Sequence, residues 1–87
     1  MKFPSKEIVD AVRNAYPVGT RVELVHMEGV QAPPIGTQGT VIGVDDTASV
    51  MVVWDNGSRL NVIYGEDIIR KVSDHDRENQ GADFIHP

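Results

Sequence analysis

The chain has 87 residues, no cysteine and a formal net charge of −5 at pH 7. This length predicts one small domain with a limited core, and the lack of cysteine excludes a disulfide scaffold, a thiolate metal site and thiol catalysis. No apolar run approaches the roughly 18 residues of a membrane span, and the polar N-terminus does not resemble a signal peptide. The sequence therefore predicts a soluble, cytoplasmic protein without a membrane partner.

The charge is unevenly distributed along the chain. Residues 1–17 contain three basic and two acidic residues, residues 18–72 contain four basic and seven acidic residues, and residues 73–87 contain one basic and four acidic residues. We interpret these parts as an N-terminal helix, a β domain and a polar tail that its composition predicts to be disordered. No part gathers the cations that neutralise phosphates, so the charge disfavours nucleic-acid binding.

The beginning of the chain has the pattern of a short amphipathic helix. Ser5 is a suitable N-cap, and Ile8, Val12 and Tyr16 recur every four residues on one face. Pro17 ends the helix, because the residue before a proline is disfavoured in the helical region. So short a helix is marginal alone in water, and we expect its apolar face to pack on the β domain.

From residue 19 onward the hydrophobic pattern has a period of two, which is typical of β-strands. Five segments follow this pattern: residues 20–27, 39–46, 49–55, 59–64 and 68–72. Gly43 interrupts the second segment and predicts a β-bulge or a sharp bend. Asn56-Gly57 separates the third segment from the fourth and predicts a hairpin with a type I′ turn, whose two central residues both take positive φ.

Five short strands within residues 18–72 predict a mainly β fold, a small antiparallel SH3-like barrel preceded by one α-helix. The long connection between the first two strands contains Pro33-Pro34, which stiffen it and whose cis or trans state the sequence leaves open. A Gly-Glu-Asp segment at residues 65–67 predicts a tight turn before the last strand.

Several segments match the pattern of a known family. They are FPSKE, YPVGTRVELVHM, QAPPIGTQGTVIGVDD, VVWDNGSRLNVIYGED and RKV. In this order, from residue 3 to residue 72, they resemble the bacterial domain of unknown function 4314 family (DUF4314). The resemblance implies an SH3-like barrel in a small bacterial or phage protein, often linked to mobile elements, with no assigned activity.

Trp54 permits two interpretations. It is in phase with Val50 and Val52, which indicates a position in the core. Alternatively, it lies open beside Tyr64 and forms an aromatic floor for a peptide or a base, as SH3-like and single-strand-binding barrels do. The phase of the strand favours the core.

The acidic charge and the absence of catalytic motifs favour a non-enzymatic module that binds an unknown protein partner. By analogy with the surfaces that such barrels use, the candidate contact residues are Met27, Gln38, Trp54, Arg59 and Tyr64. We expect the chain to be a monomer or a weak homodimer, because an open sheet edge can pair with another copy. His26, His75 and His86 lack the spacing of metal ligands, so we expect no metal and no cofactor.

The alternative is weak, specific nucleic-acid binding by a barrel similar to KOW domains, in a protein associated with a mobile element. It requires four cations to converge on one face: Arg21, Arg59, Arg70 and Lys71. Their convergence would favour nucleic acid, and their dispersal would favour a protein partner.

Overall fold

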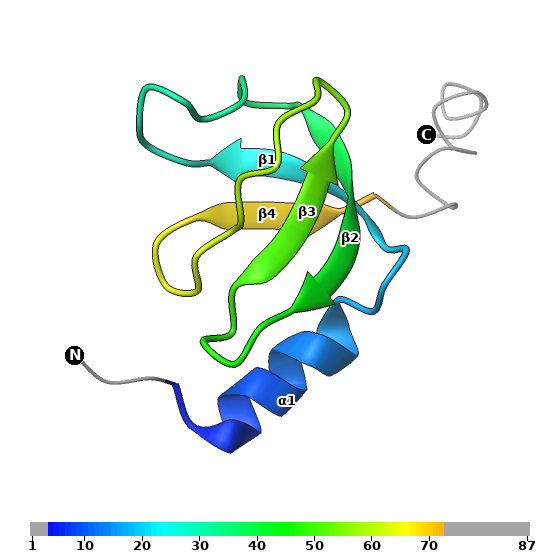
Figure 1. The fold of residues 1–87 in the computed structure, drawn as a ribbon, viewed down its shortest axis with the longest axis vertical. Helices are drawn as coiled ribbons and strands as arrows, with labels where there is room; N and C mark the ends of the chain where they lie inside the picture. Colours follow the sequence, from blue (N-terminus) through cyan, green and yellow to red (C-terminus); the bar gives the residue numbers. More distant parts are fainter. Residues whose placement is uncertain (1–3, 73–87) are drawn as a thin grey trace, which may run out of the picture.

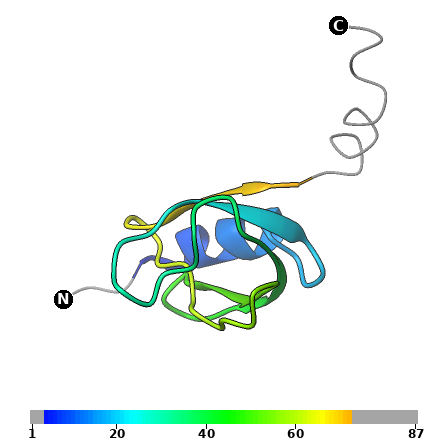
Figure 2. The ribbon, with the colours of Figure 1, turned by 90° about the horizontal axis from the view of Figure 1, so that it is seen from above.

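The computed structural model describes residues 4–72, which form one helix and a four-stranded antiparallel sheet (Figure 1). The elements in chain order are α1 Lys6–Ala15, β1 Arg21–His26, β2 Gln38–Val44, β3 Val50–Trp54 and β4 Ile68–Lys71. The strand order across the sheet is β3-β2-β1-β4. The sheet curls so that β1 and β4 lie opposite β2 and β3, and α1 covers one end of the space between them (Figures 1 and 2).

The core lies inside this curl and follows the predicted alternation of the strands. Val22 and Leu24 on β1, Val41 on β2, and Val52 and Trp54 on β3 are the largest fully buried side chains of the described residues. Alternate residues of the same strands face outward and are less buried. A period of two with one buried face is what a sheet packed on one side requires.

Helix α1 confirms the predicted N-terminal helix and its cap. The Ser5 Oγ accepts a hydrogen bond from the amide of Ile8 (3.3 Å), and the amide of Tyr16 donates to the carbonyl of Val12 (2.9 Å) at the other end. Val9 is buried, and Val12 and Tyr16 pack against the core. The apolar face therefore packs on the sheet, as a helix too short to persist alone requires.

The five-stranded SH3-like barrel is not confirmed, because the described residues form four strands and the sheet is not closed. The predicted strand at residues 59–64 makes only an isolated bridge, in which Val50 and Val62 exchange two backbone hydrogen bonds (2.9 and 2.8 Å). The carbonyl of Leu60 accepts a hydrogen bond from the indole Nε1 of Trp54 (2.8 Å). The indole thus takes an acceptor that a regular ladder would use.

Asn56-Gly57 lies in a hairpin loop, but the predicted type I′ turn is wrong. The amide of Gly57 donates to the carbonyl of Trp54 (2.9 Å), and the amide of Trp54 donates to the carbonyl of Ser58 (2.9 Å). Gly57 has a φ of +95°, whereas Asn56 does not take positive φ. This is the three-residue loop that ends in a left-handed glycine, and the Asn56 Oδ1 accepts from the amide of Ser58 (3.0 Å).

The predicted bulge at Gly43 is confirmed. The register of β2 against β3 shifts between Val41, which faces Val52, and Gly43, which faces Met51.

The long connection between β1 and β2 comes back to β1 before β2 begins, because Leu24 on β1 exchanges backbone hydrogen bonds with Gly36 and Thr37 (2.8 Å each). Residues 4–72 contain no cis peptide bond, so the Pro33-Pro34 segment is trans.

One carboxylate organises the turn between β2 and β3. The Asp45 Oδ1 accepts from the amide of Thr47 (2.9 Å), the hydroxyl of Thr47 (2.6 Å) and the amide of Ser49 (3.0 Å). These hydrogen bonds, led by the Thr47 hydroxyl, and the positive charge of Arg13 hold the pKa of Asp45 below its ordinary value of 3.8. The turn is therefore stabilised by the ionised form of Asp45.

The same turn is joined to α1 by Arg13. The Arg13 Nε donates to the carbonyl of Val44 (3.1 Å), and its Nη2 donates to the Asp46 Oδ1 (3.0 Å). Arg13 thereby fixes the last turn of the helix beside the end of β2.

We expect Asp45→Asn to lower the free energy of unfolding by about 1 kcal/mol at pH 7, because it removes charge-assisted hydrogen bonds. A carboxyl with a lowered folded-state pKa stabilises fully above its unfolded pKa, and this contribution disappears as the pH falls through the folded pKa. Urea unfolding of both proteins from pH 7 downward should therefore show a difference that shrinks below about pH 4. Asp46→Asn, which loses only an exposed ion pair, is the control. A difference that stays constant down to pH 2 would contradict this role of Asp45.

Candidate functional site

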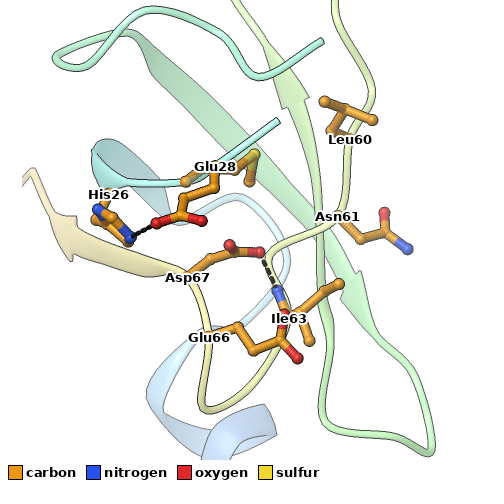
Figure 3. A pocket seen from close by; sticks show the side chains of 8 residues that line it. His26, Glu28, Leu60, Asn61, Ile63, Glu66 and Asp67 are labelled. Atoms are coloured by element: carbon orange, nitrogen blue, oxygen red, sulfur yellow. Dashed lines mark hydrogen bonds and ion pairs between the residues drawn. The ribbon is translucent and has the colours of Figure 1, made fainter. Parts of the chain in front are cut away.

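A pocket of about 430 Å³ lies between the end of β1 and the segment that leads from β3 to β4 (Figure 3). The lining residues come from two stretches that are distant in sequence: His26, Met27, Glu28, Leu60, Asn61, Ile63, Glu66 and Asp67. Pairing of β1 with β4, which places His26 opposite Ile68, brings these stretches together. We call this site the acidic pocket.

The turn before β4 fixes one wall of the acidic pocket. The amides of Glu66 and Asp67 both donate to the carbonyl of Ile63 (3.0 Å each), which confirms the predicted tight turn. The Asp67 Oδ2 in return accepts from the amide of Ile63 (2.8 Å). The Asp67 carboxylate is therefore held in place by its own turn and is oriented before any ligand arrives.

Three carboxylates, those of Glu28, Glu66 and Asp67, line the acidic pocket, and no lysine or arginine among residues 4–72 does. Figure 3 shows Glu28 and Asp67 extending from different segments toward the space between them. The Nε2 of His26 lies 3.7 Å from the Glu28 Oε2, an ion pair only when the imidazole is protonated. The pocket therefore presents a negative potential to a ligand.

The floor of the acidic pocket is partly apolar. Met27 packs against the hydrophobic core, Leu60 is half-buried, and Ile63 is exposed. An apolar floor beneath carboxylates matches the side chains of lysine and arginine, which place an aliphatic stem on apolar surface and keep the charged head in contact with water and anions.

Glu28 comes from a different segment of the chain than Glu66 and Asp67. Within residues 4–72, no three histidine, aspartate or glutamate side chains are grouped in a way that could bind one. A guanidinium, or an ammonium on a flexible stem, can reach carboxylates on separate segments.

The structure does not unite the five predicted contact residues on one surface. Met27 lines the acidic pocket, and Tyr64 lines a neighbouring pocket. Trp54 has an exposed fraction of 1%, so it belongs to the core and its ring does not form a contact floor. The Gln38 Oε1 accepts from Arg21 Nη2 (3.3 Å) on the outer side of the sheet.

Arg21, the first of the predicted nucleic-acid contacts, is held by a carboxylate. Its Nη1 and Nη2 donate to the two oxygens of Asp55 (2.9 and 2.6 Å), and Nη1 also donates to the Thr40 hydroxyl (2.9 Å). Hydrogen bonding to Arg21 holds the pKa of Asp55 below 3.8, and the same bonds raise the pKa of Arg21. A phosphate would have to displace this two-point pair.

The other predicted nucleic-acid contacts do not all lie on the face that carries Arg21. Arg70 pairs with Glu23 (2.7 Å) on the outer side of the sheet. Lys71, the next residue of the strand, lies 5.4 Å from the centre of the Tyr16 ring. Arg59 is exposed on the segment that follows the β3 hairpin. Successive strand residues point to opposite faces, so Lys71 does not share the outer face on which Arg21 and Arg70 pair with carboxylates.

Sequence reasoning missed the acidic residues of the pocket. Glu28 follows the first strand, and Glu66 and Asp67 lie in the predicted turn. The only signal was the presence of acids beside two turns, and nothing local shows that these turns meet. Their proximity depends on the pairing of β1 with β4.

The fold and the pocket define a small protein with a helix-capped, open antiparallel β-sheet and an acidic surface pocket. The chain belongs to the family described as domain of unknown function (DUF4314), whose family model matches residues 5–72. A comparison with curated proteins gave no match. No helix within residues 4–72 is both long and apolar enough to cross a membrane.

Proposed function

We propose that this chain is a non-enzymatic protein-binding module that takes a lysine or arginine side chain of its partner into the acidic pocket. The observation that carries the proposal is the combination of three carboxylates with an apolar floor in a pocket that no lysine or arginine of the described residues lines. Such a pocket complements both parts of a long basic side chain.

The geometry supports an arginine or lysine as the central contact. Its stem would lie along Met27 and Ile63, and its donors would reach the carboxylates of Glu28 and Asp67. The Glu28 side chain is 86% exposed, so each ion pair is partly screened by water and contributes about 0.2–1 kcal/mol. Binding through this pocket alone should be weak and should decrease with added salt.

A protein partner is favoured over nucleic acid by the same charges. Phosphates would be repelled by the acidic pocket, and the candidate cations Arg21 and Arg70 already pair with carboxylates. A basic protein segment meets neither obstacle.

We expect Glu28→Gln with Glu66→Gln to weaken binding of an arginine-containing peptide by about fivefold, because the variant loses the ion pair with Glu28 and the attraction of the Glu66 charge, each contributing about 0.5 kcal/mol. The peptides are selected from a random displayed library on the wild-type protein, and their affinities are measured by calorimetry. Asp67 is left unchanged because it also holds its turn.

The matched control is Glu7→Gln with Asp10→Asn on α1, which removes two negative charges outside the acidic pocket. We expect this control to bind the selected peptides as the wild type does. Selected peptides without basic residues, or equal losses in the two double variants, would contradict the proposal, because the second result would show a general charge effect.

A further inference from the structure

A second pocket lies on the other side of the Asp67 wall. It has a volume of about 270 Å³ and shares Asp67 with the acidic pocket. Its other lining residues are mainly apolar: Val12, Tyr16, Ala48, Val50, Val62, Tyr64, Gly65, Ile68 and Ile69. We call it the apolar pocket. It is smaller than the roughly 300–1,000 Å³ of pockets that hold drug-sized ligands, which suits a single side chain.

The wall between the two pockets carries exposed apolar side chains. Ile63 is 46% exposed, Tyr64 is 50% exposed and Ile68 is 53% exposed, and all three line one pocket or the other. Buried Val50 and Val62 form part of the base of the apolar pocket. A segment that crosses this wall could cover the exposed side chains while it fills both pockets, which would remove apolar surface from water.

We propose that the partner segment carries a large aliphatic or aromatic residue close in sequence to its basic residue, and that the two side chains fill the apolar pocket and the acidic pocket together. This inference rests on the proposed function of the acidic pocket. One partner segment is expected to fill both pockets because they share the wall at Asp67 and because the negative charge of the acidic pocket attracts a basic segment. Once the basic residue is bound, the apolar residue binds from within the same molecule.

Capped nonapeptides in a glycine–serine background test this directly with the full chain. One series contains arginine and leucine separated by one to four residues, and the reference peptides contain arginine alone or leucine alone. Affinities are measured by amide chemical-shift titration. We expect at least one spacing to bind about fivefold more tightly than arginine alone, because the leucine becomes partly buried.

Two variants test whether the gain in affinity from leucine arises in the apolar pocket. Tyr64→Ala opens the apolar pocket and should abolish the gain from leucine, while the affinity for the arginine-only peptide stays unchanged. Glu28→Gln with Glu66→Gln should weaken the arginine-only and the two-residue peptides by the same factor. A gain that survives Tyr64→Ala would place the leucine elsewhere and overturn the inference.

The failures of the two proposals are distinguishable. If all spacings bind as tightly as arginine alone, the inference is overturned and the acidic pocket keeps its proposed role. If no arginine-containing peptide binds, both the proposed function and the inference are wrong. Phe84 and Ile85 are apolar residues of the C-terminal segment, which lies outside the described residues. Tighter binding of leucine peptides after Phe84→Ala with Ile85→Ala would show that this segment competes for the apolar pocket. A dimer that Tyr64→Ala dissociates in sedimentation would show that a second copy fills it. Either result would overturn the inference.

Discussion

Replacing Trp54 by alanine should lower the free energy of unfolding by about 3–5 kcal/mol, the range for removing a large aromatic side chain from a core. Trp54 is 1% exposed and packs in the cluster that includes Val52 and Val62. Its indole also donates to the carbonyl of Leu60 (2.8 Å). The loss is a large fraction of the total stability of a small domain, so the variant should be partly unfolded at 37 °C.

Urea unfolding followed by circular dichroism measures this effect, because tryptophan fluorescence is lost in the variant. Trp54→Phe is the informative control: it keeps an aromatic ring in the core but leaves the Leu60 carbonyl without the indole donor. We expect it to be destabilised by about 1–2 kcal/mol, clearly less than the alanine variant. An alanine variant with the stability of the wild type and impaired peptide binding would instead make Trp54 a contact residue.

Gly39→Ala should lower the free energy of unfolding by about 2 kcal/mol, although alanine is ordinarily better tolerated than glycine inside a strand. A β-carbon at Gly39 would lie 2.6 Å from Val52 Cγ1, 2.8 Å from the backbone oxygen of Val53 and 3.0 Å from Trp54 Cε3. Gly39 faces Trp54 in the register of β2 and β3. The strand must therefore move before any side chain fits beneath the indole.

Gly43→Ala is the matched control on the same strand. A β-carbon there would meet only the Met51 Cε within 4 Å, at 2.8 Å, and this flexible end can move aside. Urea unfolding should show a clearly smaller loss for Gly43→Ala than for Gly39→Ala. Equal stabilities for the two variants would mean that the close approach of Trp54 to Gly39 is not required.

Much of the fold could be predicted because its signals are local. The Ser5 cap and the spacing of Val12 and Tyr16 predicted α1, and the alternation of buried residues predicted the four strands that form. Gly43 marked the bulge because a glycine interrupts the strand there. Each of these features depends on residues that are close in sequence.

The missing fifth strand could not be predicted from the same pattern. Residues 59–64 alternate as a strand does, but the indole of Trp54 takes the carbonyl of Leu60 and leaves a single bridge at Val62. A hydrogen bond from a side chain to the backbone competes with the ladder, and hydrophobic periodicity does not show this competition. The hairpin loop differs from the predicted type I′ turn for a separate reason: Asn56-Gly57 fits both a two-residue and a three-residue loop.

The candidate site was only partly predictable. Met27 and Tyr64 were predicted as contacts by analogy with the surfaces that SH3-like barrels use, and each lines one of the two pockets. The carboxylates of Glu28 and Asp67 become neighbours of one pocket through strand pairing between distant segments. A single sequence does not show which acids meet in space.

We propose that the acidic pocket binds a basic segment of a protein. Amide chemical shifts of the labelled chain, titrated at two salt concentrations with an arginine-containing peptide and with short single- and double-stranded nucleic acids, test it most directly. We predict saturable shifts at Met27, Glu28, Ile63, Glu66 and Asp67 with the peptide, weakened by salt, and no saturable shifts with nucleic acid. Saturable shifts with nucleic acid around Arg21, Arg59, Arg70 and Lys71, and none in the pocket with the peptide, would contradict it.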